Sequence, residues 1–424
     1  MTAAQFTLIF IIALVFTSLA RLWLARRHLV HIAAHRAAVP NAFREKITLA
    51  DHQKAADYTS AKTRFAMLGI LFDAALLLAF TLGGGIQFLT DLCNAGLHNA
   101  GFGSPLTQGV AAIVAVLLLS SLLELPFSLY RTFVIEARFG FNKMTLRLYL
   151  IDALKSLLLG AILGLPLLFG VLWLMSAMGS YWWLYVWLAW MVFNLLILFI
   201  YPTFIAPLFN KFTPLQDEAM KARIAALLGK CGFTAKGLFV MDGSKRTAHG
   251  NAYFTGFGKT KRIVFFDTLL ERLSGNEIEA VLAHELGHFK RHHVLKRIVM
   301  TFAMSLGFLW LLGQLMQTAW FYQGLGVSTP STALALLLFF MILPLFSFLL
   351  LPLMSAYSRK HEFEADAYAA RQTAATDLVN ALVKLYQDNA ATLTPDPLYS
   401  SFYDSHPPAA LRIARLQPPH LQAH

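Results

Sequence analysis

Two histidines and a glutamate in one short segment have the types and spacing of a metal-dependent hydrolytic site. The segment reads Ala-Val-Leu-Ala-His284-Glu285-Leu-Gly-His288-Phe-Lys, a His-Glu-x-x-His pattern on a helix-compatible stretch. Histidines four residues apart lie on one helix face, so both can bind one Zn²⁺ ion, and Glu285 lies beside them to act on a metal-bound water. The alternative is a helix at the membrane interface whose histidines accompany Lys290 and Arg291. The pattern favours a metal site.

A third ligand must come from elsewhere, because catalytic zinc usually has three protein ligands and one water. The chain has only two cysteines, so we expect histidine and carboxylate ligands. Residues 358–366 form the densest acidic cluster near the membrane. Glu362 and Asp366 share a helix face, whereas Glu364 points about 200° away from Glu362. We predict Glu362 as the ligand and Asp366 as its neighbour, which accepts a hydrogen bond from a ligating histidine or aids proton transfer. A solvated acidic face paired with Arg359 is the alternative.

The composition indicates that these residues belong to a membrane protein. The 424-residue chain is 57% hydrophobic and only 14% charged, outside the usual balance of a soluble domain. A spanning helix needs about 20 apolar residues, and seven stretches qualify. We expect the first to remain as an anchor, because no Lys or Arg precedes it. The expected spans are Phe6 to Leu24, Phe65 to Leu89, Val110 to Tyr130, Ser156 to Met178, Trp182 to Leu208, Ile298 to Phe321 and Leu334 to Tyr357.

Lysine and arginine are confined to alternate loops between these spans. Residues 65–130, 156–210 and 298–358 contain neither. By the positive-inside rule, the basic loops and the C-terminus face the cytoplasm and the N-terminus faces out. The formal net charge of +12 therefore reflects topology, and we expect a lipid bilayer as partner and no nucleic acid.

The predicted fold class is an all-α polytopic membrane protein with about seven transmembrane helices and a small α+β cytoplasmic insert. We divide the chain into 1–209 with five spans, 210–297 as the insert ending in the His-Glu-x-x-His helix, 298–357 with two spans, and 358–424 as a cytoplasmic region with the third ligand. The metal helix is expected to continue into the sixth span. The insert is expected to contain a helix near Gln216 to Gly229, a strand at Leu238 to Met241, a turn at Asp242-Gly243, and β-like runs at Asn251 to Phe257 and Arg262 to Phe266.

These motifs together resemble the type 1 CAAX prenyl protease family of integral-membrane zinc metallopeptidases. The resemblance rests on His284-Glu-Leu-Gly-His288 and on Glu362-Phe-Glu-Ala-Asp366. Further matching segments extend it from Phe139 to about Leu416, namely Phe139-Gly-Phe-Asn-Lys143, Tyr201 to Leu215, Asp242 to Arg246, Asn251 to Phe254 and Ser405 to Pro408. It implies a seven-helix barrel around a large water-filled chamber with one Zn²⁺ near the cytoplasmic end, and a zinc metalloendopeptidase acting near that membrane face.

The resemblance also implies roles for two residues outside the metal helices. Asn251 matches an asparagine beside a strand edge that aligns the substrate backbone. His406 matches a histidine that helps to bind substrate or stabilise the oxyanion. Taken alone, Asn251 could be a turn former and His406 a surface histidine.

The resemblance further bears on substrate and location. The expected substrates are peptides or proteins, including C-terminal tails and membrane-anchored proteins. Eukaryotic members often have a longer tail with signals for the endoplasmic reticulum, whereas this chain ends in Gln422-Ala-His424, so we expect a bacterial plasma membrane. The sequence does not indicate an oligomeric state.

Two carboxylates lie deep in the predicted spans. Exposing Asp73 or Glu124 to lipid would cost about 2.5 to 3.5 kcal/mol, so we expect both to face inward, toward a wet chamber or a neighbouring helix. A transporter using them is an alternative function, but it leaves the metal motif unexplained. A catalytically idle scaffold would more naturally have lost Glu285 or a ligand. We therefore expect an active enzyme with Glu285 as general base, assisted by Asp366 and His406.

Overall fold

The computed structural model describes residues 1–255 and 260–417, which are mostly helical. Within these residues, seven segments are long and apolar enough to cross a membrane, so the chain is a multi-pass membrane protein and the predicted number of spans is confirmed. The main helices of these segments are α1 (Ala3–His35), α2 (Leu49–Phe80), α4 (Pro105–Tyr130), α5 (Leu146–Ala177), α6 (Trp182–Ile200), α11 (His293–Leu315) and α13 (Thr332–Ser347).

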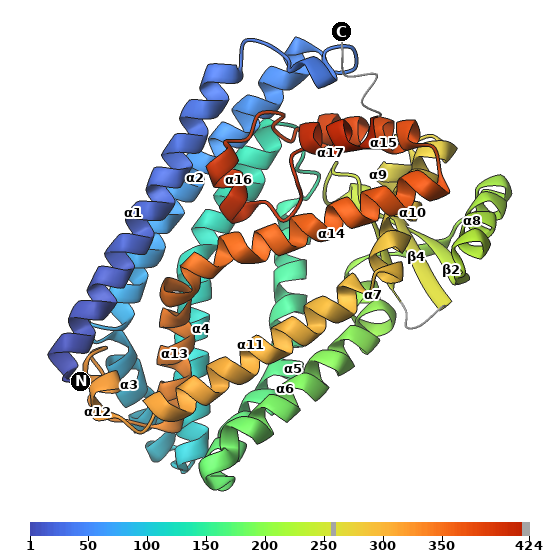
Figure 1. Cartoon of the computed structure of the whole chain (residues 1–424). Helices are drawn as coiled ribbons and strands as arrows, with labels where there is room; N and C mark the ends of the chain where they lie inside the picture. Colours follow the sequence, from blue (N-terminus) through green and yellow to red (C-terminus); the bar gives the residue numbers. More distant parts are fainter. Residues whose placement is uncertain (256–259, 418–424) are drawn as a thin grey trace.

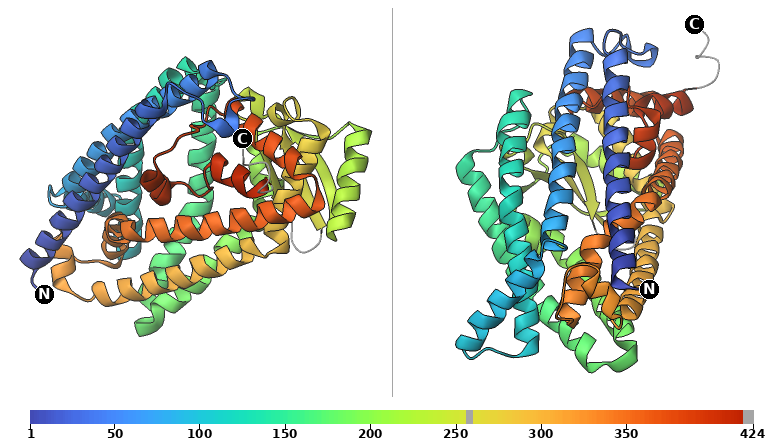
Figure 2. Two further views of the ribbon diagram at one scale, coloured as in Figure 1. Left: turned by 45° about the horizontal axis from the view of Figure 1, so that its top comes forward. Right: turned by 90° about the vertical axis from the view of Figure 1, so that its left-hand side faces the viewer.

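The spanning helices form a barrel whose wall is one helix thick (Figures 1 and 2). In the segments that contain α5 and α6, only 6% of the most apolar 18-residue stretch is buried. A helix in a solid bundle would instead bury a broad apolar stripe. Asp73 and Glu124 are exposed rather than packed against a neighbouring helix, which contradicts that alternative. That both carboxylates face the inside of the barrel stays a prediction, which rests on the cost of exposing a carboxylate to lipid.

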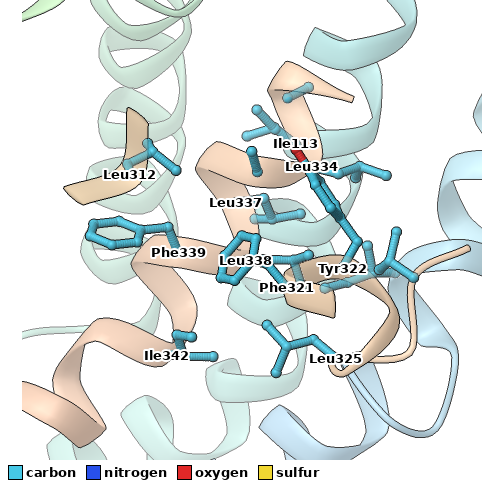
Figure 3. Close-up of a cluster of buried hydrophobic side chains, with 14 of the residues drawn as sticks. Ile113, Leu312, Phe321, Tyr322, Leu325, Leu334, Leu337, Leu338, Phe339 and Ile342 are labelled. Carbon is cyan, nitrogen blue, oxygen red and sulfur yellow. The ribbon is translucent and has the colours of Figure 1, made fainter. Parts of the chain in front are cut away.

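A hydrophobic cluster closes the end of the barrel that holds the N-terminus (Figure 3). The short helix α12 (Ala319–Gln323) inserts Phe321 beside Leu338 of α13, and both are fully buried. On the other side of α12, the rings of Trp320 and Phe6 lie 4.9 Å apart. This packing ties the first span to the seventh.

Two predicted span boundaries are wrong at this end. The second span does not extend to Leu89, because α2 ends at Phe80 and a new helix, α3 (Gly85–Asn99), follows. The two helices are separated by a turn at Gly84, whose φ of 78° favours glycine. Likewise, α11 ends at Leu315 rather than Phe321. Hydropathy cannot separate two apolar helices that are joined by a short turn.

The seventh apolar segment covers the predicted span but is not one straight helix. α13 ends at Ser347, a 3-10 turn covers Phe348–Leu350, and α14 (Leu351–Gln372) then leaves in a different direction (Figure 1). Pro352 lies in the first turn of α14, where its missing N–H costs no helical hydrogen bond. The bend carries α14 across the open end of the barrel.

The insert between α6 and α11 is a mixed sheet covered by helices. The strands β1 (Phe212–Pro214), β2 (Thr234–Met241), β3 (Ala252–Thr255) and β4 (Thr260–Phe266) have the order β1-β2-β4-β3. β4 is parallel to β2 and antiparallel to β3, so β3 is an edge strand. The predicted helix and strands are present, with α8 spanning Glu218–Cys231, but β1 was not predicted. Residues 256 and 257 of one predicted run lie outside the described residues.

Four further helices pack in or around this insert, namely α9 (Asp267–Leu270), α10 (Gly275–Lys290), α15 (Ala375–Asp388) and α17 (Ala409–Leu416). The short helix α7 (Ala206–Phe209) precedes the insert, and α16 (Pro397–Tyr403) packs on α14 and α1. A second buried core joins α8, β4, α10, α14 and α15 through side chains such as Ile224, Phe265, Ile278 and Leu382. The insert and the C-terminal helices are therefore one packed unit at the end of the barrel opposite the N-terminus (Figure 1).

The loops segregate by charge as the topology predicts. At the basic end, Lys46 donates to Asn380 of α15, and the backbone N–H of Lys143 donates to Arg246 of the insert. At the other end, the loops that lack lysine and arginine meet each other, with the backbone N–H of Ser328 3.1 Å from the Gln87 Oε1. All three basic loops therefore lie at the end that holds the insert.

Candidate metal centre

The helix that carries the two histidines is well defined at its start. At the N-cap of α10, Ser274 accepts a hydrogen bond from the backbone N–H of Glu277, whose side chain accepts in return from the Ser274 N–H. Such a capping box satisfies two donors that would otherwise lack partners. Ile278 and Leu282 then bury one helical face in the core of the insert. The sequence pattern thus fixes where α10 begins and which face it buries.

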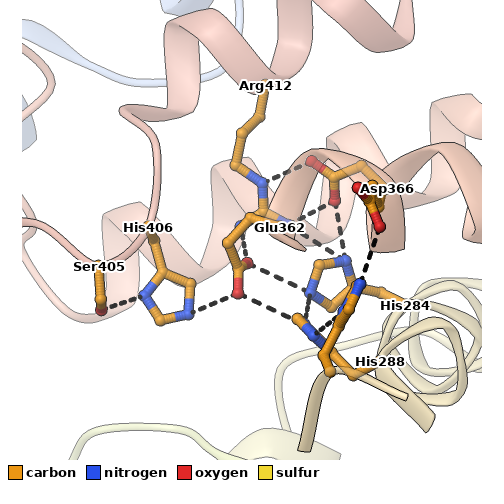
Figure 4. Close-up of polar contacts among 9 residues, drawn as sticks. His284, His288, Glu362, Asp366, Ser405, His406 and Arg412 are labelled. Carbon is orange, nitrogen blue, oxygen red and sulfur yellow. Dashed lines mark hydrogen bonds and ion pairs between the residues drawn. The ribbon is translucent and has the colours of Figure 1, made fainter. Parts of the chain in front are cut away.

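A close helix crossing brings the acidic segment onto α10. Gly287 lies against α14, where an added Cβ would be 3.0 Å from Ala365 Cα and 3.1 Å from the Ala365 carbonyl oxygen. Only glycine leaves room for this approach without displacing backbone atoms. The crossing places Glu362 and Asp366 of α14 beside His284 and His288 (Figure 4).

The three predicted ligands converge, and their donor atoms all lie within 4.8 Å of one another. The Nε2 atoms of His284 and His288 are 3.2 Å apart. His284 Nε2 is 3.4 Å from Glu362 Oε2, and His288 Nε2 is 3.4 Å from the other oxygen, Oε1. Two ligands bound to one metal at about 2.0 to 2.1 Å in a tetrahedral site lie about 3.3 to 3.4 Å apart. Each of these separations is therefore of the size that zinc or a similar ion would bridge.

The electrostatics of the cluster also fit a cation. Burial would lower the pKa of His284, but its close contacts with the carboxylates of Asp366 and Glu362 outweigh burial and raise the pKa to about 9. Among the described residues, Glu362 Oε2 is buried without a hydrogen bond, although it faces His284 Nε2. The cluster therefore favours a positive charge between these side chains.

Asp366 occupies the position that was predicted for it. Its Oδ1 lies 2.8 Å from His284 Nδ1, which leaves His284 Nε2 directed at Glu362. A carboxylate behind a ligating imidazole fixes the ring and its tautomer. The structure thus brings Asp366 next to the ligands and not among them.

Sequence reasoning missed Arg412 of α17. Its guanidinium donates to both oxygens of Asp366, at 2.8 and 2.6 Å, and it is buried. It also lies 3.8 Å from Glu362. The only local signal was a single arginine four residues after Pro408, which does not distinguish it from a surface residue. The guanidinium compensates the negative charge that two buried carboxylates would otherwise leave.

His406 reaches the cluster from the loop between α16 and α17. Its Nε2 lies 3.4 Å from Glu362 Oε1, and its Nδ1 is 3.0 Å from the Ser405 hydroxyl (Figure 4). Arg359 of α14 fixes this loop by donating to the backbone carbonyls of Ser400, Ser401 and Asp404. Arg359 therefore anchors the loop and is not the partner of a solvated acidic face. His406 itself stays 63% exposed at its side chain, so a bound molecule could contact it.

The structure does not bring every predicted residue into the cluster. Glu285 follows His284 on α10 and is half-buried. Asn251 is exposed immediately before the edge strand β3, and its side chain accepts from the Ala252 N–H. β3 nevertheless lies next to the metal helix, because the rings of Phe254 and Phe289 are 6.0 Å apart.

The expectation that α10 continues into the sixth span is wrong. α10 ends at Lys290, and His292 adopts a left-handed conformation with φ of 57° before α11 begins at His293. A residue other than glycine is uncommon there. The break turns the sixth span away from the metal helix.

Comparison with known proteins gives consistent matches along the chain. Residues 28–211 match the model for the CAAX prenyl protease N-terminal region with five membrane helices, and residues 214–420 match peptidase family M48. "CAAX prenyl protease 1 homolog" of Caenorhabditis elegans is 35% identical, covering 91% of this chain and 92% of that protein. "CAAX prenyl protease 1" of Saccharomyces cerevisiae is 35% identical, covering 89% and 88%.

A solved structure matches the whole architecture. The crystal structure of S. mikatae Ste24p superposes with a TM-score of 0.92 at 32% identity, covering 98% of this chain and 100% of that one. The chain therefore belongs to the CAAX prenyl protease branch of peptidase family M48 and is a membrane zinc metalloprotease.

Proposed function

From the membership of this family, we propose that the chain binds one Zn²⁺ through His284, His288 and Glu362 and hydrolyses peptide bonds with Glu285 as general base. The observation that carries the proposal is the convergence of the two histidine Nε2 atoms, 3.2 Å apart, on the Glu362 carboxylate, whose two oxygens each lie 3.4 Å from one of these nitrogens. When bound, zinc supplies Lewis-acid polarisation of a water molecule and of the scissile carbonyl group.

The chain's own residues then have distinct tasks. Glu285 accepts the proton of the attacking water and passes it to the leaving amine. Asp366 accepts from His284 Nδ1–H, which leaves the Nε2 lone pair free for the metal. Arg412 keeps Asp366 ionised and in place. His406, exposed and directed at Glu362, donates to the oxygen that gains charge as the carbonyl is attacked.

Substrate would bind as an extended strand. Among the described strands β3 lies at the edge of the sheet, and Asn251 immediately precedes it. Adding a peptide strand to a sheet edge is a common mode of peptide recognition. Asn251 would set the register of that strand relative to the metal helix.

We further propose that the site faces the cytoplasm, because the insert lies at the end that holds the basic loops. Substrates would then be peptides or C-terminal tails of cytoplasmic or membrane-anchored proteins. The CAAX prenyl proteases among the relatives suggest such tails as the class to test first. The relatives named above are eukaryotic, and the bacterial plasma membrane stays a prediction.

Zinc content and peptide cleavage of the purified full-length protein test this proposal together. We expect about one zinc per wild-type chain and reduced occupancy in Glu362→Gln. Glu285→Gln should keep zinc and lose turnover by about two to four orders of magnitude, because an amide fits the site but cannot take a proton. Glu364→Gln is the comparison for Glu362→Gln, since it changes the other glutamate of the same helix and keeps a side-chain oxygen that can accept from His293.

Two results would contradict the proposal. Near wild-type turnover of Glu285→Gln would exclude Glu285 as the base. Unchanged zinc in Glu362→Gln, with loss of zinc in Glu364→Gln, would show that the third ligand is wrongly assigned.

A further inference from the structure

The second ligating histidine has a hydrogen-bond partner outside the proposed mechanism. His288 Nδ1 lies 3.0 Å from the Nδ1 of His293, the first residue of α11. The Nε2 of His293 lies 3.0 Å from Glu364 Oε2 on α14. His293 is only 4% exposed. A chain of three side chains therefore runs from the ligand cluster to the carboxylate that was excluded as a ligand.

The proton positions along this chain are fixed by chemistry. Nε2 of His288 faces Glu362, so it must be unprotonated to bind a metal, and the ring proton then lies on Nδ1. Two facing Nδ1 atoms can share only one proton, so His288 donates and His293 accepts. The proton of neutral His293 must then lie on Nε2, where it is donated to Glu364. Every nitrogen has one role and one partner.

The surrounding structure holds His293 in place. Its ring stacks on that of His361, with centroids 4.0 Å apart and planes 10° apart. In an uninterrupted helix, His293 would lie about 140° around the axis from His288 and could not meet its ring. The left-handed His292 breaks the helix and turns His293 back toward His288. A strained conformation that persists next to a metal cluster indicates a functional constraint.

We propose that His293 and Glu364 form a positioning pair that holds His288 in the tautomer and orientation needed to bind zinc. The inference rests on the proposed metal site and adds two residues to it. Asp366 contacts and orients His284 directly, whereas Glu364 orients His288 through the intervening ring of His293. One helix, α14, thereby supplies a ligand and the carboxylates behind both histidines.

Zinc affinity of the full-length protein, measured by competition with a chromogenic chelator, tests the pair. Loss of such a partner typically weakens metal binding 10- to 100-fold, and we expect about that for His293→Ala and Glu364→Ala. Glu364→Gln should stay within about threefold of wild type, because its amide oxygen still accepts from His293. Glu279→Ala is the control, since it removes an α10 carboxylate that pairs with Arg223 and contacts neither histidine.

Two further measurements separate positioning from folding and from the metal site itself. The melting temperature of the zinc-free protein should be nearly unchanged in Glu364→Ala, and the visible spectrum of the Co²⁺-substituted protein should change. Wild-type zinc affinity in both alanine variants would contradict the proposed positioning pair. So would a loss of zinc affinity that is accompanied by a matching drop in the melting temperature of the zinc-free protein, because that loss would reflect folding. If His288→Ala binds zinc with wild-type affinity, His288 is not a ligand, and the proposed metal site itself is wrong.

Discussion

At the scale of single residues, the site depends on balanced buried charge. Glu362, Asp366 and Arg412 are each at most 6% exposed. Two carboxylates against one guanidinium leave a net negative charge that a metal cation offsets. Buried charges are tolerated only when they are paired and hydrogen-bonded, so the loss of one member costs more than the lost contact.

Arg412→Met should destabilise the protein by about 3 to 5 kcal/mol, because Asp366 would keep a buried charge with no cation beside it. Adding Asp366→Asn should recover part of that stability. Zinc affinity of the double variant should stay below wild type, because a neutral amide supports His284 less well than a carboxylate. Melting temperature and zinc titration measure the two effects separately.

Arg415→Met is the control for this pair of variants, because Arg415 lies on the same helix and stacks on Phe363 outside the ligand cluster. Equal losses of stability in Arg412→Met and Arg415→Met would contradict a special role for the buried pair.

At the scale of elements, the crossing of α10 and α14 decides whether the ligands meet. The crossing depends on Gly287, a position that the His-Glu-x-x-His pattern leaves unspecified. Gly287→Ala should cost about 1 to 3 kcal/mol through overpacking against Ala365 and should weaken zinc binding as Glu362 is pushed away. Gly229→Ala in α8, where an added Cβ meets nothing within 4 Å, should be neutral or stabilising. Thermal unfolding measures the stability of the two variants, and zinc titration measures their zinc affinity. Equal effects of the two substitutions would contradict a special role for Gly287.

The start of α10 is also tied to α15 by a pH-sensitive contact. Burial would raise the pKa of Glu277, but hydrogen bonds from Lys384 and Ser274 outweigh it and lower the pKa below its ordinary value. A lowered carboxylate pKa stabilises the fold above the unfolded-state value of about 4.3, and the stabilisation is lost as pH falls through the folded-state value.

We therefore expect Glu277→Gln to be less stable than wild type by about 1 kcal/mol near neutral pH. The difference should vanish when pH falls well below 4, because Glu277 is then protonated in both states. Melting temperatures of both proteins across pH 3 to 7 measure it. A difference that is independent of pH would indicate a packing effect instead.

At the scale of the whole molecule, sidedness determines which proteins can reach the site. The basic loops and the insert lie at one end of the barrel, and loops that lack lysine and arginine meet at the other. We expect the end with the insert to be cytoplasmic. In a variant with Cys93 and Cys231 replaced by alanine, a new cysteine at exposed Ser328 should react with an impermeant thiol reagent in intact cells.

A cysteine at exposed Lys236 of the insert should react only after the cells are permeabilised. The reverse labelling pattern would overturn the topology and would make exported proteins the expected substrates.

The sequence by itself determined the features that depend on local pattern. Periodicity placed both histidines on one face of α10, and apolar length gave the seven spans. The choice of Glu362 over Glu364 as ligand also followed from helical angle, and of these two glutamates it is Glu362 that lies with both histidines. Asp366 was placed behind a histidine on the same grounds.

Only the tertiary structure decided the features that depend on contacts between distant segments. Arg412 and His293 carry no local signal, because their role comes from helices that pack side by side and not from their spacing in sequence. The turn at Gly84, the bend after Ser347 and the break at His292 escaped prediction because hydropathy records how apolar a stretch is and not the direction of its axis. A metal site needs atoms placed to within tenths of an ångström, and such placement is set by packing between helices.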